Sequence, residues 1–213
     1  MKKYDVAIVG GGPAGVMAAY ELVEKKPGLR VIVFESGKDI YHRVCPISAG
    51  KVKSCIGCKP CSIMRGFGGA GAFSDGKYNF TTKFGGWLNE YLPDDEVMEL
   101  IDYVDKINMK HGAPSKVFST KGSDIGRLAL QHDLHLLSAS VRHLGTENNL
   151  RMLEKTYEYL KTKVEFRFEC PVAHIESDGQ GNNQLELENG EKVEADFLVI
   201  APGRAGAEWF SNE

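Results

Sequence analysis

The feature that most constrains the fold is a glycine-rich turn directly after the first apolar segment. Residues 4–9 are apolar and rich in β-branched side chains, and Gly10-Gly11-Gly12-Pro13-Ala14-Gly15 follows at once. The apolar positions of residues 13–26 then recur at helical spacing, and residues 30–34 form a second continuous apolar run. A strand, a tight turn, a helix and a second strand make up a βαβ unit. The pattern therefore predicts an α/β, Rossmann-like fold with a parallel central sheet.

The turn also matches G-x-G-x-x-G, which binds the pyrophosphate of a dinucleotide when it joins a strand to a helix. Gly10 permits the sharp turn, Gly12 lets phosphates approach the backbone, and Gly15 lets the helix pack on the strand. The helix that starts at Pro13 and Ala14 offers the free N–H groups of its first turn, from Ala14 onward, and a partial positive charge to the diphosphate. We therefore expect these five residues to bind a cofactor.

The identity of the cofactor depends on Glu35 and on the later chain. Glu35 ends the second strand, where a carboxylate accepts the hydroxyls of the adenosine ribose and repels a 2′-phosphate. This predicts FAD or NAD and argues against NADP. FAD is favoured because several flavoprotein families share a large insertion after the second strand and a late strand that ends in an A-x-G turn, here Ala201-Pro202-Gly203. Ala201 and Gly203 are therefore added to the expected cofactor site.

The remaining pattern predicts the domain organisation. Residues 36–93 have no clear periodicity and are too long for a plain connection, so they are interpreted as a Cys- and Gly-rich insertion. Residues 94–144 begin with a predicted helix over 94–110 and are interpreted as the start of a substrate or cap region. Residues 1–35 and 145–213 are expected to form the dinucleotide-binding domain. Its later part should contain a helix from Thr146, a β-meander over 164–195 and a last buried strand over 197–200.

Composition excludes several classes of protein. The 213 residues carry a net charge of −3, which gives no basic footprint for nucleic acid. No apolar run approaches the roughly 20 residues that span a bilayer, so no membrane partner is expected. The N-terminus imitates a signal peptide, but Gly10–Pro13 would break its apolar core, and a cytoplasmic location is expected. A small-molecule substrate or a redox partner is the expected partner.

Four of the five cysteines fall within a short segment. Cys45, Cys55, Cys58 and Cys61 supply four thiols, and the C-x-x-C-x-x-C spacing is of the kind that iron–sulfur and zinc sites use. The Cys-Pro pair precedes the run, which departs from the ferredoxin spacing. Three interpretations stay open: a metal or iron–sulfur site in which the four thiols cluster, a redox-active dithiol facing the flavin, and free thiols. Cys170 lies on an alternating strand and is expected in the core.

The order of these motifs resembles the FAD-dependent dehydrogenases, often called NAD(FAD)-utilizing dehydrogenases, a family of two-dinucleotide-fold flavoproteins. Besides the first glycine motif, Glu35 and the cysteine run, the resemblance rests on the strings Gly68-Gly69-Ala70-Gly71-Ala72-Phe73-Ser74-Asp75-Gly76-Lys77, Arg142-His143-Leu144-Gly145-Thr146 and Ala201-Pro202-Gly203-Arg204. It covers the whole chain, which looks like the first half of such a protein. The resemblance implies that a substrate domain and a flavin-contacting C-terminal segment lie outside this chain. We therefore expect the chain alone to bind FAD poorly or not at all, and its activity in isolation is in doubt.

A second glycine loop, residues 66–71, precedes Ser74 and Lys77. Small residues let backbone N–H groups come close to a ligand, and similar flavoproteins use such a loop beside the pyrophosphate and the ribityl chain. Gly68, Gly69 and Ala70, together with Ser74 and Lys77, are therefore expected to contact the cofactor. The alternative is a surface loop without a ligand.

Two classes of function remain at this point. The first is an FAD-dependent oxidoreductase, or its FAD-binding half, with NAD as a conceivable electron partner and an unknown substrate. The second is a non-catalytic module that binds a nucleotide or an iron–sulfur cluster or zinc. The sequence assigns no catalytic residue and no oligomeric state.

Overall fold

The computed structural model describes residues 2–179 and 182–212, and the chain divides into two compact units. The first unit combines residues 1–73 with residues 153–213, and the second comprises residues 74–152. This division differs from the boundaries expected from the sequence, because residues 36–73 belong to the same unit as the central sheet. The assignment of a function to each part stays a prediction.

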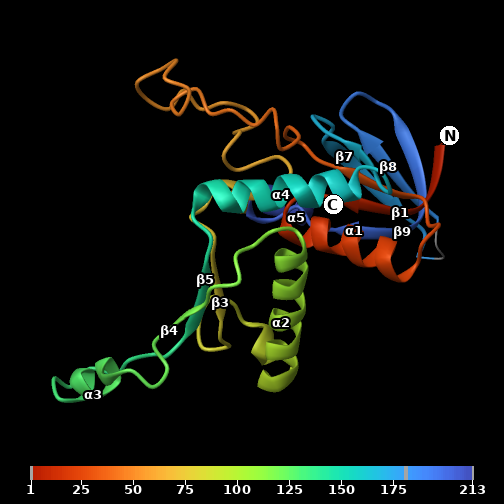
Figure 1. Cartoon of the computed structure of the whole chain (residues 1–213). Coiled ribbons are helices and arrows are strands. Elements are labelled where there is room, and N and C mark those ends of the chain that lie inside the picture. The colour runs from red at the N-terminus through yellow and green to blue at the C-terminus, as the bar shows by residue number, and fades with distance from the viewer. Residues whose placement is uncertain (1, 180–181, 213) are drawn as a thin grey trace. The chain divides into compact units, whose positions relative to one another are not determined.

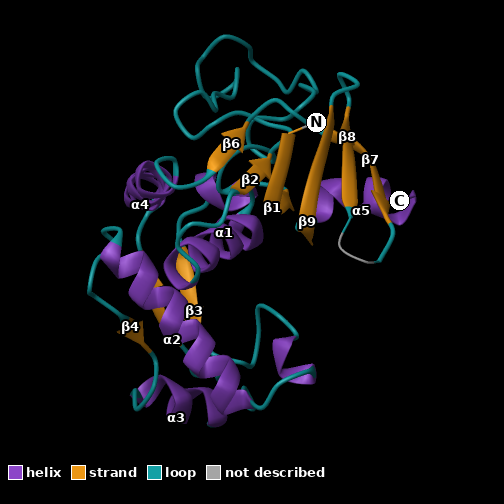
Figure 2. Ribbon diagram, turned by 90° about the vertical axis from the view of Figure 1, so that its right-hand side faces the viewer, coloured by secondary structure: helices purple, strands orange, loops and turns teal. Residues whose placement is uncertain are grey.

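The first unit is built on a six-stranded sheet with the strand order β6-β2-β1-β9-β8-β7 (Figures 1 and 2). β1 pairs in parallel with β2 and with β9, and β2 pairs in parallel with β6. β7, β8 and β9 form an antiparallel meander that extends the same sheet. The strands are β1 (Lys2–Val9), β2 (Val31–Phe34), β6 (Glu165–Arg167), β7 (Val172–Ser177), β8 (Asn183–Leu187) and β9 (Lys192–Ile200). The predicted α/β fold is confirmed, and the three apolar runs lie in the neighbouring strands β2, β1 and β9. Two expectations are wrong: the meander begins at Val172 and not at residue 164, because β6 pairs in parallel with β2, and the last strand is not buried over 197–200, because Phe197 is 70% exposed.

Burial explains why the apolar runs form central strands. All four residues of β2 are buried, as expected for a parallel strand that is covered on both faces. On one face Val6, Ile8 and Val33 pack with Ala19 of α1 (Pro13–Lys25). Figure 2 shows α1 lying along this sheet. The other face of β1 and β2 shares a core with Leu185, Leu187 and other residues of the meander.

An aromatic cluster closes the β6 edge of the first unit. The ring of Tyr157, on α4 (Thr146–Leu160), lies 5.0 Å from the ring of Phe67 and 5.6 Å from that of Phe166, measured between centroids. Phe67 is fully buried although it lies in a loop. Through Phe67 the cluster therefore anchors the second glycine loop to the core. The unit also contains η1 (Gly69–Phe73), η3 (Arg204–Gly206) and α5 (Ala207–Asn212).

The second unit contains a small antiparallel sheet with the order β3-β5-β4. Its elements are β3 (Lys77–Phe80), η2 (Leu88–Glu90), α2 (Asp94–Lys110), β4 (Phe118–Ser119), α3 (Asp124–Leu130) and β5 (Ser140–His143). Helix α2 has the bounds that its periodicity predicts. Arg142 of β5 is buried and forms a two-pronged ion pair with Asp105 of α2, at 2.6 and 2.7 Å. This pair ties the helix to the sheet.

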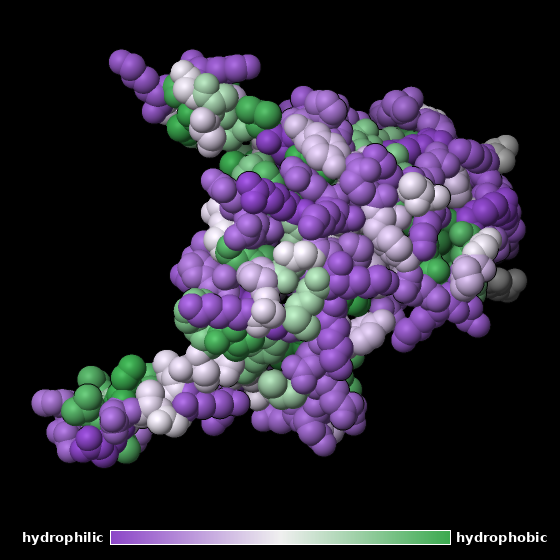
Figure 3. All heavy atoms as spheres, in the orientation of Figure 1, coloured by the Kyte–Doolittle hydropathy of each residue, from purple (hydrophilic) through white to green (hydrophobic). Residues whose placement is uncertain are grey.

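The surface around α3 is rich in exposed apolar side chains. Ile125, Leu128 and Leu130 are each about half exposed, as are Leu134 and Leu137 beyond the helix. Figure 3 shows hydrophobic atoms gathered over this helix. None of the helices in the described residues is long and apolar enough to cross a membrane.

Candidate functional site

The first glycine loop is tied to the ends of two strands. The N–H of Gly10 donates to the carbonyl of Phe34 at 2.8 Å, and the N–H of Ala201 donates to the carbonyl of Val9 at 2.8 Å. Gly10 has a φ of +108°, and a Cβ there would overlap the carbonyl oxygen of Ala201. Gly10 therefore makes the predicted sharp turn and also admits the backbone that follows β9.

Gly15 and Gly12 have different reasons to lack a side chain. A Cβ at Gly15 would overlap the carbonyl oxygen of Gly10 and would lie 3.2 Å from Cγ2 of Ile8, so α1 packs directly on the first turn and on β1. A Cβ at Gly12 would meet nothing within 4 Å, because this residue faces open space. Gly12 is the N-cap of α1 and forms no side-chain cap hydrogen bond. The start of the helix is therefore open to an anionic ligand.

A cleft of about 670 Å³ lies over this loop. All of its lining residues belong to the first unit. Its lining comes from the first glycine loop, the end of β2, the second glycine loop, the start of β7 and the turn after β9, together with Glu188 and Trp209. The lining contains Gly10, Gly12, Pro13, Ala14, Glu35, Gly69, Ala70, Ala201 and Gly203 from the residues that the sequence singled out. The structure thus brings together motifs from opposite ends of the sequence, such as Gly10 and Gly203.

Glu35 joins three backbone segments. One carboxylate oxygen, Oε2, accepts the N–H of Gly11 at 2.7 Å. The other, Oε1, accepts the N–H of Gly37 at 2.7 Å and that of Gly66 at 2.9 Å. A carboxylate has about four acceptor positions, so Oε2 keeps one for a further donor. Glu35 is buried and lines the cleft, so it holds the two glycine loops together and still presents an acceptor.

The second glycine loop lies against the first. The N–H of Gly68 donates to the carbonyl of Gly11 at 2.8 Å, and a Cβ at Gly69 would lie 3.1 Å from Cδ of Pro13. Gly69 and Ala70 line the cleft, whereas Gly68 is buried and serves this contact between the loops. These contacts place the second loop beside the first, and its contact with a cofactor stays a prediction.

Ser74 and Lys77 belong to the second unit. Oγ of Ser74 accepts the N–H of Gly76 at 3.2 Å, and Nζ of Lys77 lies 2.7 Å from a carboxylate oxygen of Asp75. Both side chains have partners in their own turn, and neither is among the residues that line the cleft. Their contact with a cofactor stays a prediction.

The expected cluster of four cysteines does not form. In the part of the chain that the structure describes, no three His, Cys, Asp or Glu side chains are grouped so that they could hold a metal. All of the cysteines are free thiols, and Cys55 is exposed. The described structure therefore does not group Cys45, Cys55, Cys58 and Cys61 as a metal site requires, and metal binding by these residues stays a prediction.

Local turns explain why these cysteines do not converge. The thiol of Cys45 is bonded to the backbone N–H groups of Ser48 and Ile47, which lower its pKa. The carbonyl of Cys61 accepts the N–H groups of Met64 and Arg65 in a different turn. Each of these two cysteines thus belongs to a local turn of its own, and the exposed segment between them contributes little to the core.

Two residues that line the cleft, Arg65 and Trp209, were not predicted, whereas Arg204 was a weak candidate to face either a phosphate or solvent. Arg65 directly precedes the second glycine loop, and its guanidinium donates to the carbonyl of Ala205 at 3.0 Å. Trp209 of α5 lines the cleft and donates its indole N–H to the carbonyl of Ala173 at 2.9 Å. Arg204 is exposed at the rim. Their positions next to the glycine loop and to the A-x-G turn were the available signal, but their side-chain directions depend on the folded chain.

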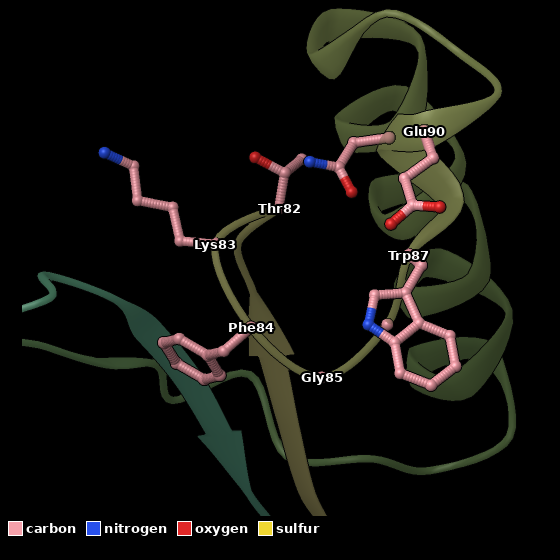
Figure 4. Close-up of a pocket in the computed structure, with 8 residues that line it drawn as sticks. Thr82, Lys83, Phe84, Gly85, Trp87 and Glu90 are labelled. Carbon is pink, nitrogen blue, oxygen red and sulfur yellow. The ribbon is translucent and has the colours of Figure 1, made fainter.

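A second hollow, of about 520 Å³, lies in the second unit (Figure 4). It is formed by one stretch of chain, residues 82–90, and Phe84 and Trp87 stand on either side of the loop. Trp87 is 78% exposed, and no buried polar group points to a ligand there. The cleft of the first unit is therefore the stronger candidate.

Known proteins are similar to this chain over part or most of its length. Residues 1–40, which include the βαβ unit and Glu35, match the Thi4 family. A 203-residue alignment with an uncharacterized protein of Clostridium beijerinckii is 24% identical and covers 95% of this chain and 31% of that protein. A 60-residue alignment with the mitochondrial L-2-hydroxyglutarate dehydrogenase of Dictyostelium discoideum is 35% identical and covers 28% of this chain and 14% of that protein.

Among solved structures, an L-amino acid deaminase from Proteus vulgaris aligns with a TM-score of 0.50 and 17% identity, over 99% of this chain and 56% of that protein. At this identity the similarity establishes the fold alone, a Rossmann-like α/β fold of the kind found in flavoprotein oxidoreductases. The chain spans about a third of the length of the Clostridium relative and about half of the deaminase.

Proposed function

We propose that the first unit binds FAD as part of an FAD-dependent oxidoreductase. The observation that carries the proposal is the position of Gly12. This residue is the N-cap of α1, forms no side-chain cap hydrogen bond and lines the cleft. A Cβ at this position would meet nothing within 4 Å. The match to the Thi4 family over residues 1–40 and the fold support FAD as the ligand.

The residues of the cleft fit the phosphate and ribose parts of FAD. Gly12 leaves room for a diphosphate, and Pro13 and Ala14 begin a helix whose dipole favours negative charge. The remaining acceptor position on Oε2 of Glu35 suits a ribose hydroxyl and would repel a 2′-phosphate. At about 670 Å³ the cleft has the size usual for small-molecule sites.

The chemistry of the oxidoreductase would come from the flavin, which when bound supplies two-electron redox chemistry. The chain's own residues bind and orient: the first glycine loop holds the diphosphate, Glu35 selects the ribose, and Gly69 and Ala70 present the backbone of the second loop. A contact of Ser74 or Lys77 with the flavin, and NAD as the electron partner, are further parts of the proposal. The substrate is a small molecule of unknown class.

A calorimetric titration with FAD, ADP and 2′-phospho-ADP tests this proposal. We expect ADP and FAD to bind, FAD weakly, and 2′-phospho-ADP to bind less well than ADP. Gly12→Ala should weaken FAD and ADP at least about tenfold, because the added methyl occupies the phosphate position. Its free energy of unfolding should change by less than about 1 kcal/mol, because the methyl meets no protein atom within 4 Å.

Gly86→Ala is the matched control. Gly86 also has open space around its Cβ position, and it lies in the second unit. This variant should bind both nucleotides like the parent chain. A parent chain that binds neither FAD nor ADP, or a Gly12→Ala variant with unchanged affinity, would contradict the proposal.

A further inference from the structure

Arg43 is a buried arginine in the loop after β2. It is 4% exposed and donates to four backbone carbonyls. Nε donates to Ser62 at 3.0 Å, Nη2 to Ile63 at 2.9 Å, and Nη1 to Phe67 at 2.6 Å and to Gly69 at 2.8 Å. All four acceptors lie within residues 62–69, the segment that leads into and includes the second glycine loop.

The same segment makes both contacts with the first glycine loop and its acidic partner. The N–H of Gly66 donates to Glu35, and the N–H of Gly68 donates to the carbonyl of Gly11. Along the chain these two donors alternate with Phe67 and Gly69, whose carbonyls accept hydrogen bonds from Arg43. Arg43 therefore bonds the carbonyl groups of this segment, while Glu35 and Gly11 bond its N–H groups.

Packing leaves little freedom in this arrangement. A Cβ at Gly66 would lie 2.6 Å from Cδ of Arg43, and a Cβ at Gly37 would overlap the backbone nitrogen of Gly66. The guanidinium carbon of Arg43 lies 4.9 Å from the centre of the Phe73 ring, at the end of η1. Arg43 thus lies close to Gly66, at the start of the second glycine loop, and to Phe73, just after the loop ends.

The charge of Arg43 is not neutralised by an ion pair. Among the residues that the structure describes, no carboxylate lies within ion-pair distance of its guanidinium. Burial lowers the pKa of Arg43 to about 10, which reflects the cost of keeping this cation away from water. The nearby Glu35 carboxylate partly offsets this cost without forming an ion pair, and the four carbonyls satisfy the hydrogen bonds of the buried guanidinium.

We propose that Arg43 is a positioning residue of the cofactor site: its guanidinium holds the carbonyls of residues 62–69 so that the second glycine loop lies against the first. Through this loop it sets the affinity for the phosphate and ribose part of a dinucleotide. This inference rests on the proposed function, because the cleft that the two loops form is the proposed FAD site.

Arg43→Lys tests the inference, because lysine keeps the positive charge and loses the planar fork that reaches four carbonyls. We expect faster amide hydrogen exchange at Gly66 and Gly68 and an FAD dissociation constant about ten- to a hundredfold higher, at an unchanged folded fraction. Arg43→Gln, which is uncharged and has fewer donors, should have a larger effect. Because glutamine buries no charge, it also serves as the second variant if the buried ammonium of Arg43→Lys impairs folding.

Arg142→Lys is the matched control. Arg142 is equally buried, but it bonds Asp105 in the second unit, and it is not among the residues that line the cleft. This variant should lose stability without a change in FAD affinity once the folded fraction is accounted for. It should also leave exchange at Gly66 and Gly68 unchanged.

Two outcomes would overturn the inference. The first is an equal loss of FAD affinity in Arg43→Lys and Arg142→Lys. The second is an increase in exchange that spreads evenly over the first unit, which would make Arg43 a general stabilising residue. A parent chain that binds neither FAD nor ADP overturns the proposed function and with it the effect on affinity. The exchange result at Gly66 and Gly68 would then decide separately whether Arg43 places the loop.

Discussion

The first glycine loop and the cysteine segment, residues 45–61, are held in very different ways. Gly10 and Gly15 are packed against backbone atoms, and Glu35 secures the loop through Gly11. The cysteine segment is mostly exposed, and a Cβ at its Gly57 would meet no atom within 4 Å. The difference is one of support: a strand and a helix fix the two ends of the glycine loop, whereas the cysteine segment contains no helix or strand.

This comparison teaches when the spacing of a motif determines its geometry. Within the βαβ unit, the backbone directions are set by the sheet and by α1, so a fixed spacing places each glycine. In an exposed loop, the same kind of spacing leaves many conformations open. Local hydrogen bonds, such as those to the thiol of Cys45, then decide where the side chains lie.

The largest expected effect comes from Gly10→Ala compared with Gly57→Ala. Both glycines have a positive φ, but a Cβ overlaps the Ala201 carbonyl at Gly10 and meets nothing at Gly57. We expect a loss of about 3–5 kcal/mol in the free energy of unfolding at Gly10 and about 1 kcal/mol at Gly57. Urea unfolding followed by circular dichroism measures both. Equal losses would show that the two loops are supported alike.

Glu35→Ala should have the next largest effect. It leaves three N–H groups without their acceptor, those of Gly11, Gly37 and Gly66, at a cost of about 2–4 kcal/mol. Glu188→Ala is the control, because Glu188 also lines the cleft but is exposed, and its loss should cost less than about 0.5 kcal/mol. Urea unfolding gives both values. Glu35→Ala should also bind 2′-phospho-ADP and ADP more equally, and an unchanged preference would remove Glu35 from nucleotide selection.

A smaller effect is expected in thiol reactivity. Hydrogen bonds from Ser48 and Ile47 lower the pKa of Cys45, and burial raises the pKa of Cys170. At pH 7 Cys45 therefore has the larger thiolate fraction and should be alkylated by iodoacetamide at least about tenfold faster. The ratio should fall as the pH rises, because Cys170 then gains thiolate while Cys45 approaches full ionisation. Peptide mass spectrometry gives the two rates, and a faster Cys170 would contradict the geometry around Cys45.

The smallest expected effect is the response to metal. Because no three possible ligands are grouped within the described residues, equimolar zinc should change the unfolding temperature by less than about 2 °C. Serine variants of Cys45, Cys55, Cys58 and Cys61 should behave like the parent chain in this assay. A rise of several degrees that disappears in the Cys58→Ser variant would restore the metal interpretation and remove the contrast between the two loops.

The regular elements were predictable where the sequence pattern was strong. Helix α2 has its expected bounds, and β1, β2 and β9 are neighbours in one sheet as the apolar runs predict. The alternating pattern of residues 164–170 predicts one strand that includes Cys170. The strand β6 is shorter, because only Glu165–Arg167 pair with β2. The expected cofactor residues of the first loop line the cleft or pack beneath it, but the pattern gave no sign of Arg43. A single arginine after a strand has no motif, and its role appears only when four carbonyls surround it.

The sequence by itself determined the βαβ unit, the turn chemistry of Gly10, Gly12 and Gly15, and the acidic residue at the end of β2. These features depend on interactions between residues close in the chain, which spacing and residue type specify. Only the tertiary structure decided that Arg43 holds residues 62–69, that Arg65 and Trp209 line the cleft, and that the cysteines do not group as metal ligands. The reason is physical: these outcomes depend on hydrogen bonds and packing between distant segments, and they form only once the sheet has fixed where each segment begins and ends.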